Sequence, residues 1–307
     1  MTAKAGEWRA RRARSCPVCN TPNSEAQLFL EENIDPTRIT EFSFASRKAP
    51  EHMSHRLMRC PTCDLVYVDQ PPVAEELSQA YHQASYDSSE EADDAAAVYI
   101  RSFENVLPRL SKGRALEIGT GSGAFLEALL DAGFSEVVGV EPSLAAIASA
   151  PEHRRSWIRE GNFEEGDFAP ESFDLIVCFM TMEHVLEPGL IARAAHRLLR
   201  AGGAFVTVTH DYRSPANRIL GRRSPIIDIE HMQLFSPKSI KKLFESAGYR
   251  DITSRAFVNR YSGSYWLRLL PVPSVMRSAV TRLAAASRID RVKIGLNVGN
   301  AFTVGFK

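Results

Sequence analysis

A glycine-rich turn between an apolar strand and an amphipathic helix constrains the fold of this chain most strongly. Residues 115 to 118 form a short apolar run that ends in the sequence GTGSG at residues 119 to 123. The next segment places leucine and phenylalanine on one helical face and stops at Gly133. Glycines let such a turn approach a ligand without a Cβ clash, and the helix after it begins with free N–H groups. The sequence therefore predicts a ligand site where this strand meets its helix.

Strands and helices alternate from residue 114 onward. The predicted strands are 115–118, 137–140, 156–162, 173–179, 205–209, 252–257 and 301–306. A helix is predicted over 190–200, ended by two glycines, and another opens at Ser236-Pro237 and closes at Gly248. This alternation predicts an α/β fold with a doubly wound, mostly parallel Rossmann-like sheet.

Two acidic residues accompany the glycine turn. Glu141 ends the second predicted strand, 18 residues after the turn, where a carboxylate can accept both hydroxyl protons of a ribose. Glu117 stands two residues before the first glycine and suits a ligand with an ammonium group better than a pyrophosphate. Ala124 stands where a dinucleotide fingerprint would have its third glycine. Together these residues predict a nucleoside cofactor site.

Five segments between residues 74 and 257 resemble the class I S-adenosylmethionine-dependent methyltransferases in order and spacing. They read LEIGTGSGAFLEAL, VVGVEPS, SFDLIVCFMTMEHVLEP, HRLLRAGGAFVTVT and HMQLFSPKSIKKLFESAGY. The resemblance implies S-adenosylmethionine (SAM) as methyl donor. It also implies that the cofactor-binding residues are Glu117, Gly119, Gly121, Glu141, Asn162 and Phe163. In this family an aspartate usually stands at the position of Asn162, whose amide oxygen can still accept from the adenine amino group.

His184 follows the fourth predicted strand, at the sheet edge where ligands bind. In many relatives a histidine here faces the transferred methyl group, so the resemblance implies His184 as catalytic base. The alternative is a histidine satisfied by the backbone at a helix start. Quinone-precursor O-methyltransferases bind a divalent cation through an E-x-x-E-H pattern in this loop. Glu183 and His184 match its last two ligands but Met180 replaces the first, which argues against a metal here.

Several further polar residues are candidates for the acceptor side. His210 and Tyr212 follow the fifth predicted strand, and His231 lies in the EHMQLF segment. Each is as readily structural as functional. Tyr81 and Tyr86 precede the sheet where relatives have a lid over the cofactor.

Four of the five cysteines form two Cys-x-x-Cys pairs, Cys16 with Cys19 and Cys60 with Cys63. Four thiolates make a closed tetrahedral set that suits a structural zinc ion, with iron as the chemical alternative. Unrelated reduced cysteines are the competing interpretation. Cys178 stands in an apolar run and is predicted to be a core residue.

The predicted organisation is a zinc-binding module over 1–72, a helical linker or lid over 73–112 and a methyltransferase domain over 113–307. A helical insertion is predicted at about 259–294, which either packs on the sheet or touches a membrane surface or lipid-linked substrate. Equal numbers of basic and acidic side chains, 37 of each, disfavour nucleic acid as partner. The chain shows neither a secretory signal nor a run of about 20 apolar residues, so a cytoplasmic location is expected.

The combined layout resembles bacterial methyltransferases with an N-terminal zinc-binding domain, among them sugar C-methyltransferases that act on nucleotide-linked deoxysugars. We therefore expect methyl transfer to a small-molecule acceptor, a sugar or a biosynthetic intermediate. One alternative is an rRNA methyltransferase, because some of these also begin with a zinc module. Another is a non-catalytic binding protein on the same fold. The oligomeric state stays open.

Overall fold

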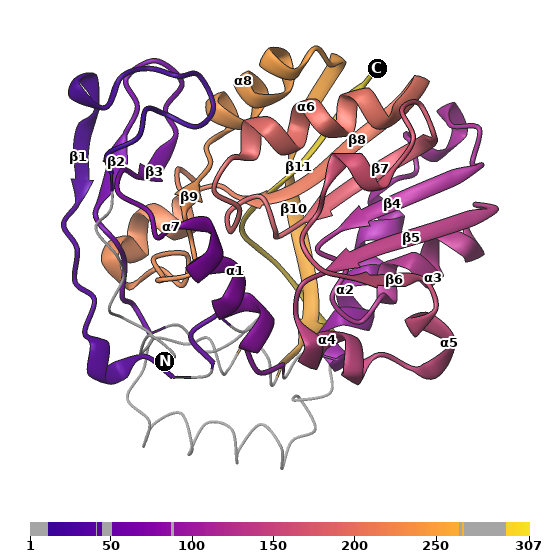
Figure 1. The fold of residues 1–307 in the computed structure, drawn as a ribbon, viewed down its shortest axis with the longest axis horizontal. Helices are drawn as coiled ribbons and strands as arrows, with labels where there is room; N and C mark the ends of the chain where they lie inside the picture. The colour runs from indigo at the N-terminus through magenta and orange to yellow at the C-terminus, as the bar shows by residue number, and fades with distance from the viewer. Residues whose placement is uncertain (1–11, 41, 45–50, 87–88, 264–265, 267–292) are drawn as a thin grey trace.

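A seven-stranded sheet forms the centre of the molecule in the computed structural model, which describes residues 12–40, 42–44, 51–86, 89–263, 266 and 293–307 (Figure 1). The strand order is β10-β11-β8-β7-β4-β5-β6. The strands are β4 (Arg114–Ile118), β5 (Glu136–Glu141), β6 (Ile158–Glu160), β7 (Phe173–Phe179), β8 (Leu199–His210), β10 (Arg250–Ser262) and β11 (Lys293–Phe306). Strands β4 to β8 pair in parallel, and β11 is antiparallel to both its neighbours. The predicted doubly wound, mostly parallel sheet is confirmed.

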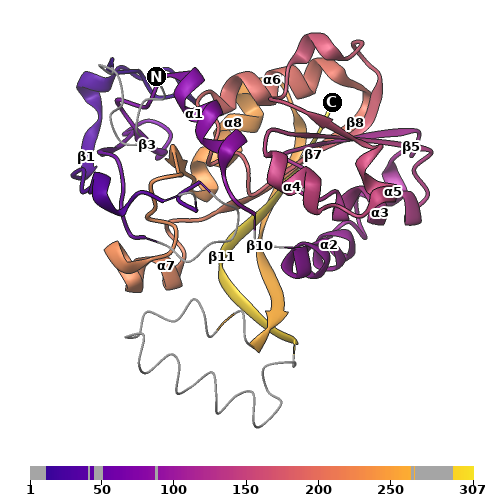
Figure 2. The same ribbon diagram turned by 60° about the horizontal axis from the view of Figure 1, so that its bottom comes forward.

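Helices cover both faces of this sheet. Helices α2 (Ser89–Ser102) and α3 (Ala124–Asp131) lie on one side, and α6 (Pro188–Leu198) and α8 (Pro237–Ala247) lie on the other (Figure 2). Successive residues of β7 lie on alternate faces of the sheet. Leu175 and Val177 pack with α2 and α3. Ile176 and Cys178 pack with α6 and α8. Burial on both faces explains the continuous apolar sequence of β7, and it confirms Cys178 as a core residue.

Helix α8 begins at the predicted capping residue, Ser236, and ends at the predicted glycine. Ser236 caps α8 by accepting a hydrogen bond from the backbone N–H of Ser239, and Pro237 occupies the first turn. Gly248 ends the helix in a left-handed conformation with a φ of 96°.

The remaining helices are α1 (Ala74–Gln83), α4 (Leu144–Ser149), α5 (Glu152–Arg155) and α7 (Pro215–Leu220), with short 3-10 turns η1 (Asn23–Glu25), η2 (Pro36–Arg38), η3 (Leu107–Arg109), η4 (Glu165–Asp167) and η5 (Gly221–Arg223).

The N-terminal region forms a second, antiparallel sheet beside the large one (Figure 1). Its strands are β1 (Gln27–Leu30), β2 (Leu57–Arg59), β3 (Val66–Val68) and β9 (Gln233–Leu234). Strand β9 comes from the second half of the chain and pairs with β3, which the sequence did not predict. Arg14 adds to this connection, because its Nε donates to Val68 O at 2.8 Å and its Nη2 to Met232 O at 3.3 Å. The N-terminal region is therefore joined to the segment that follows α7.

The predicted boundaries of α6, β8, β10 and β11 were wrong. Helix α6 ends at Leu198 and β8 begins at Leu199, although a helix was predicted to Arg200 and a strand only from Phe205. Sheet pairing explains the difference, because Leu199 pairs with Phe173 and the backbone of Gly203 bonds to Lys307. Strands β10 and β11 also extend beyond the predicted 252–257 and 301–306, into both ends of the predicted insertion.

The predicted apolar helix around residues 275–283 lies outside the described residues. Within the part of the chain that the structure describes, no helix combines the length and apolar character needed to cross a membrane.

The order of the strands fixes where a ligand site can form. Strand β4 lies between β5 and β7, so the chain moves outward from β4 to β6 and then crosses back to β7. In open α/β sheets the carboxyl ends at such a switch point form a crevice. Gly119 ends β4 here with a φ of 77°, and a Cβ atom at this position would lie 2.3 Å from Thr181 Oγ1. Only glycine allows the loop after β7 to approach this closely.

Candidate functional site

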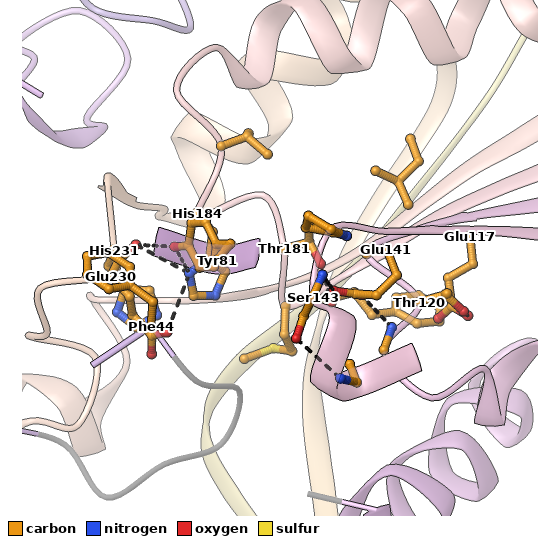
Figure 3. A pocket seen from close by; sticks show the side chains of 18 of the residues that line it. Phe44, Tyr81, Glu117, Thr120, Glu141, Ser143, Thr181, His184, Glu230 and His231 are labelled. Atoms are coloured by element: carbon orange, nitrogen blue, oxygen red, sulfur yellow. Dashed lines mark hydrogen bonds and ion pairs between the residues drawn. The ribbon is translucent and has the colours of Figure 1, made fainter. Parts of the chain in front are cut away.

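A cavity of about 1090 Å³ opens at the carboxyl ends of β4, β5 and β7. Helix α1, the loop after β7, residues 225–231 and the distal parts of β10 and β11 complete its walls. Figure 3 shows two groups of polar side chains in it, with Glu117, Thr120, Glu141 and Ser143 on one side and Tyr81, His184, Glu230 and His231 on the other. We call these the cofactor end and the acceptor end of the cavity.

Glu141 is held at the cofactor end by two backbone hydrogen bonds. Its Oε2 accepts from the N–H of Gly121 at 2.7 Å and its Oε1 accepts from the N–H of Ser143 at 2.9 Å. Burial raises the pKa of this carboxyl group, and the two backbone donors act in the opposite direction. Each oxygen keeps a second lone pair. The carboxylate is thus oriented and can accept a hydrogen bond from each of two neighbouring hydroxyl groups.

Glu117 and the glycine turn lie beside Glu141. The carboxylate of Glu117 is buried and accepts a hydrogen bond of 2.6 Å from Thr120 Oγ1. Gly119 and Gly121 both have positive φ angles and line the cavity. The four cofactor residues predicted in the glycine turn and at the end of β5 therefore share one wall, with a carboxylate at each side of the turn. These two carboxylates are hydrogen-bond acceptors and fit a nucleoside that also carries an ammonium group.

Asn162 and Phe163 line the same end of the cavity. The amide nitrogen of Asn162 donates to Ser78 Oγ of α1 at 2.7 Å, so the amide oxygen is directed away from that partner. Phe163 stacks on Phe168 with ring centroids 6.3 Å apart. Helix α1 covers this end. That Asn162 and Phe163 flank an adenine stays a prediction.

The acceptor end contains a connected group of titratable side chains. His184 Nδ1 lies 3.0 Å from the hydroxyl oxygen of Tyr81 and 3.9 Å from Glu230 Oε2. Tyr81 donates to the backbone oxygen of Glu230 at 2.9 Å. Burial, reinforced by nearby carboxylates, raises the pKa of Tyr81 well above its usual value, so the hydroxyl keeps its proton at neutral pH. The ring of His231 lies 4.9 Å from that of His184, centroid to centroid.

Glu183, the second glutamate position of the E-x-x-E-H pattern, forms hydrogen bonds with the backbone of other segments. Its carboxylate accepts from the backbone N–H of His210, and burial raises its pKa to about 8. Its backbone oxygen accepts from the N–H of Met232 at 2.8 Å. These hydrogen bonds to His210 and Met232 hold the loop after β7 in position. That the E-x-x-E-H pattern does not bind a metal here stays a prediction.

The other candidate residues divide between the cavity and the N-terminal region. His210 lines the cavity, and burial lowers its pKa to about 4, so its ring is neutral at physiological pH. Tyr81 and Tyr86 also line the cavity. Tyr212 lies elsewhere, because its hydroxyl donates to Asp64 O at 3.0 Å, beside the second cysteine pair. The sequence did not single out Glu230, although it precedes His231 directly.

The four paired cysteines come together in the N-terminal region. Cys16 Sγ lies 3.5 Å from Cys63 Sγ, and Cys19 Sγ lies 3.4 Å from Cys60 Sγ. The two pairs occupy equivalent turns, because the fifth residue of each turn donates its N–H to the oxygen of the first cysteine, at 2.9 and 3.0 Å. All four sulfur atoms lie within 4.8 Å of one another. This arrangement fits a tetrahedral metal ion bound by four thiolates.

Comparison with known proteins identifies relatives of this fold and sequence. A family model described as a methyltransferase domain matches residues 89–254. The ubiquinone biosynthesis O-methyltransferase of Idiomarina loihiensis is 25% identical over 170 residues, which cover 51% of this chain and 69% of the relative. The enzyme of that name from Pseudomonas aeruginosa is 34% identical over 103 residues, 31% of this chain and 43% of the relative.

A solved structure supports the fold. The SAM-dependent methyltransferase from Thermotoga maritima, named a possible histamine N-methyltransferase, aligns with a TM-score of 0.50 at 20% identity. The alignment covers 72% of this chain and 93% of that protein. At this identity the likeness shows the fold alone.

Proposed function

The chain belongs to the SAM-dependent methyltransferases, and from that premise we propose that it transfers a methyl group to a hydroxyl group of a small-molecule acceptor. The observation that carries this proposal is that one cavity contains both the Glu141 carboxylate and the His184 group. Methyl transfer needs donor and acceptor aligned at roughly 3–3.5 Å, which requires both sites to share one enclosed space.

The cofactor end would hold SAM by its ribose and its amino-acid part. Glu141 binds the two ribose hydroxyls, since its oxygens are already oriented by Gly121 and Ser143. Glu117 attracts the ammonium group, and Asn162 and Phe163 flank the adenine. When bound, SAM supplies a methyl group on a sulfonium sulfur.

The acceptor end would activate the hydroxyl group. We assign this activation to His184, because an imidazole can accept a proton near neutral pH and His184 lines the cavity. Tyr81 and Glu230 hold the ring from one side. The name of the ubiquinone biosynthesis relatives, O-methyltransferase, favours oxygen as the acceptor atom. Sugar hydroxyls and the phenolic hydroxyls of biosynthetic intermediates both present this chemistry.

The paired cysteines would serve structure and not the reaction. We propose that Cys16, Cys19, Cys60 and Cys63 bind one zinc ion, because four thiolates leave no position for a catalytic water. None of the five cysteines forms a disulfide, which fits a protein that works in the reducing cytoplasm.

The experiment is a methyl-transfer assay with radiolabelled SAM. Nucleotide-linked deoxysugars form one arm, ortho-dihydroxybenzenes form a second and ribosomal RNA forms a third. Label in either small-molecule arm, lost in His184→Ala and kept in His153→Ala, supports the proposal. The control residue is an exposed histidine beside Glu127 that does not line the cavity. Label in the RNA arm alone, or a protein that does not bind SAM, would overturn it.

A further inference from the structure

Three side chains at the acceptor end form a possible set of metal ligands that no single sequence motif contains. One nitrogen of His184, one nitrogen of His231 and one carboxylate oxygen of Glu230 all lie within 4.8 Å of one another. We call these three residues the His–Glu–His cluster. His184 follows β7, whereas Glu230 and His231 follow η5, so two distant segments supply the donors. The cluster lines the cavity and is separate from the four cysteines.

Backbone and side-chain hydrogen bonds fix the two segments against each other. The backbone oxygen of Glu183, next to His184, accepts from the N–H of Met232 at 2.8 Å. The side-chain amide of Gln233 donates to Val185 O at 2.7 Å. Glu183, Met232 and Gln233 are fully buried. The three donors are therefore held in place by the fold itself, as an ion-binding site requires.

The orientation of His231 is the one found in metal-binding histidines. Its Nδ1 lies 2.9 Å from the backbone oxygen of Ile226. A carbonyl oxygen only accepts, so Nδ1 carries the proton and Nε2 carries the lone pair. A metal-ligating histidine characteristically donates its other N–H to a carbonyl or carboxylate in this way.

The electrostatic surroundings favour a cation. The carboxylates of Glu230 and Asp228 both act on Tyr81 at this end of the cavity. Among the described residues that line the cavity, Arg197 is the only lysine or arginine, and it forms an ion pair with Glu165 at 2.5 Å. The side chains of His184 and Glu230 are 20% and 11% exposed, so the cluster is enclosed but open to the cavity.

We propose that the His–Glu–His cluster binds a divalent first-row transition-metal ion at the acceptor end of the cavity. Two imidazoles and one carboxylate suit ions such as iron(II), cobalt(II) or zinc, whereas magnesium and calcium prefer oxygen ligands alone. Three protein ligands leave positions open for a substrate. This donor set differs from the E-x-x-E-H set, because it uses neither Glu183 nor position 180.

The inference rests on the proposed methyl transfer to a hydroxyl group, but it makes His184 a ligand of the cation in place of the residue that accepts the proton. A bound cation lowers the pKa of a hydroxyl group that coordinates it. The acceptor hydroxyl then gives its proton to solvent, and its oxygen forms the new bond to the methyl carbon. The carbon–sulfur bond breaks, and its electron pair stays on sulfur. His184 contributes its lone pair to the cation and does not take the proton itself.

The test is a cobalt(II) titration of the purified full chain, with neither SAM nor acceptor present, followed by visible absorption. Ligand-field bands from a nitrogen and oxygen site should saturate at one equivalent, without the intense thiolate charge-transfer bands that the cysteines would give. Glu230→Gln and His231→Ala should each weaken this binding by about tenfold or more. His153→Ala, which removes an exposed histidine beside a glutamate, should leave it unchanged. Thermal melting of each variant verifies folding, and Glu230→Gln carries the test if His231→Ala does not fold.

Absence of ligand-field bands in the wild-type protein, or their persistence in both cluster variants, would overturn the inference. A methyl-transfer rate that is unaffected by a chelator would also overturn the inference. His184 would then remain the base of the proposed reaction. Cobalt binding at the cluster in a protein that does not bind SAM would support the metal site and refute the proposed function. The two claims therefore fail separately.

Discussion

Glu141 accepts a hydrogen bond of 2.7 Å from the backbone N–H of Gly121. This bond joins the end of β5 to the glycine turn after β4, in which Gly121 has a positive φ of 57°. The turn and the acid are separate patterns in the sequence, but they form one structural unit. A change at either residue should therefore disturb the same binding site.

Replacement of Glu141 by alanine should weaken SAM binding by at least about tenfold. A hydrogen bond to a charged group contributes about 1.5–3 kcal/mol, and Glu141 is positioned to accept two from a ribose. Ligand binding raises the melting temperature by mass action, so saturating SAM should stabilise the wild-type protein more than Glu141→Ala. Glu136→Ala, at the exposed start of the same strand, is the control and should behave like the wild type. Equal stabilisation of Glu141→Ala would show that the carboxylate does not contact the ligand.

Replacement of Gly119 by alanine should destabilise the fold and impair the cofactor end. The new Cβ would lie 2.3 Å from Thr181 Oγ1, and the φ of 77° is unfavourable for a side chain. A loss of about 1–3 kcal/mol in unfolding free energy is expected from chemical denaturation. The double variant Gly119→Ala/Thr181→Gly should recover part of this loss, because it removes the clash but not the backbone strain. Gly166→Ala has no heavy atom within 4 Å of the new Cβ and should be tolerated.

Replacement of Cys60 by serine should remove a metal ion and lower stability. Elemental analysis of the wild-type protein should find zinc at the cysteine set, and Cys60→Ser should lose it together with several degrees in melting temperature. Cys178→Ala is the matched control, since Cys178 is fully buried in β7 of the large sheet and does not belong to the set of four sulfur atoms within 4.8 Å of one another. Its metal content should not change. A wild-type protein that is folded without metal would refute the zinc site.

Replacement of His184 by alanine should lower turnover by about a hundredfold or more while SAM affinity stays close to that of the wild type. The side chain lies at the acceptor end, apart from the residues around Glu141 (Figure 3). The measurement compares kcat with the SAM dissociation constant for the two proteins. An unchanged kcat would exclude His184 from activation of the acceptor. A loss of SAM affinity as large as the loss of kcat would show that His184 acts at the cofactor end of the cavity.

The cofactor end could be predicted from sequence because its residues follow local rules. A glycine turn after a strand and an acid after the next strand meet whenever those strands are parallel neighbours, as β4 and β5 are. The acceptor end could not be predicted in the same way. Glu230 meets His184 only because the segment before β9 is bonded to the loop after β7, and no periodic pattern reports such a contact.

The same limit applies to the strand boundaries. Local glycines predicted a helix end near residue 202, but pairing of Leu199 with Phe173 decided where β8 begins. Strand β9 spans two residues, Gln233–Leu234, and is too short to show an alternating pattern. Its pairing with β3 depends on the folded arrangement of both regions.

Isothermal titration of the intact chain with SAM tests the central claim most directly. The account predicts saturable binding at one site per chain, with the product S-adenosylhomocysteine competing for the same site. It also predicts that this heat signal does not depend on any acceptor, because the Glu141 carboxylate is already oriented by its backbone donors. Absence of SAM binding by a folded wild-type protein would contradict the account.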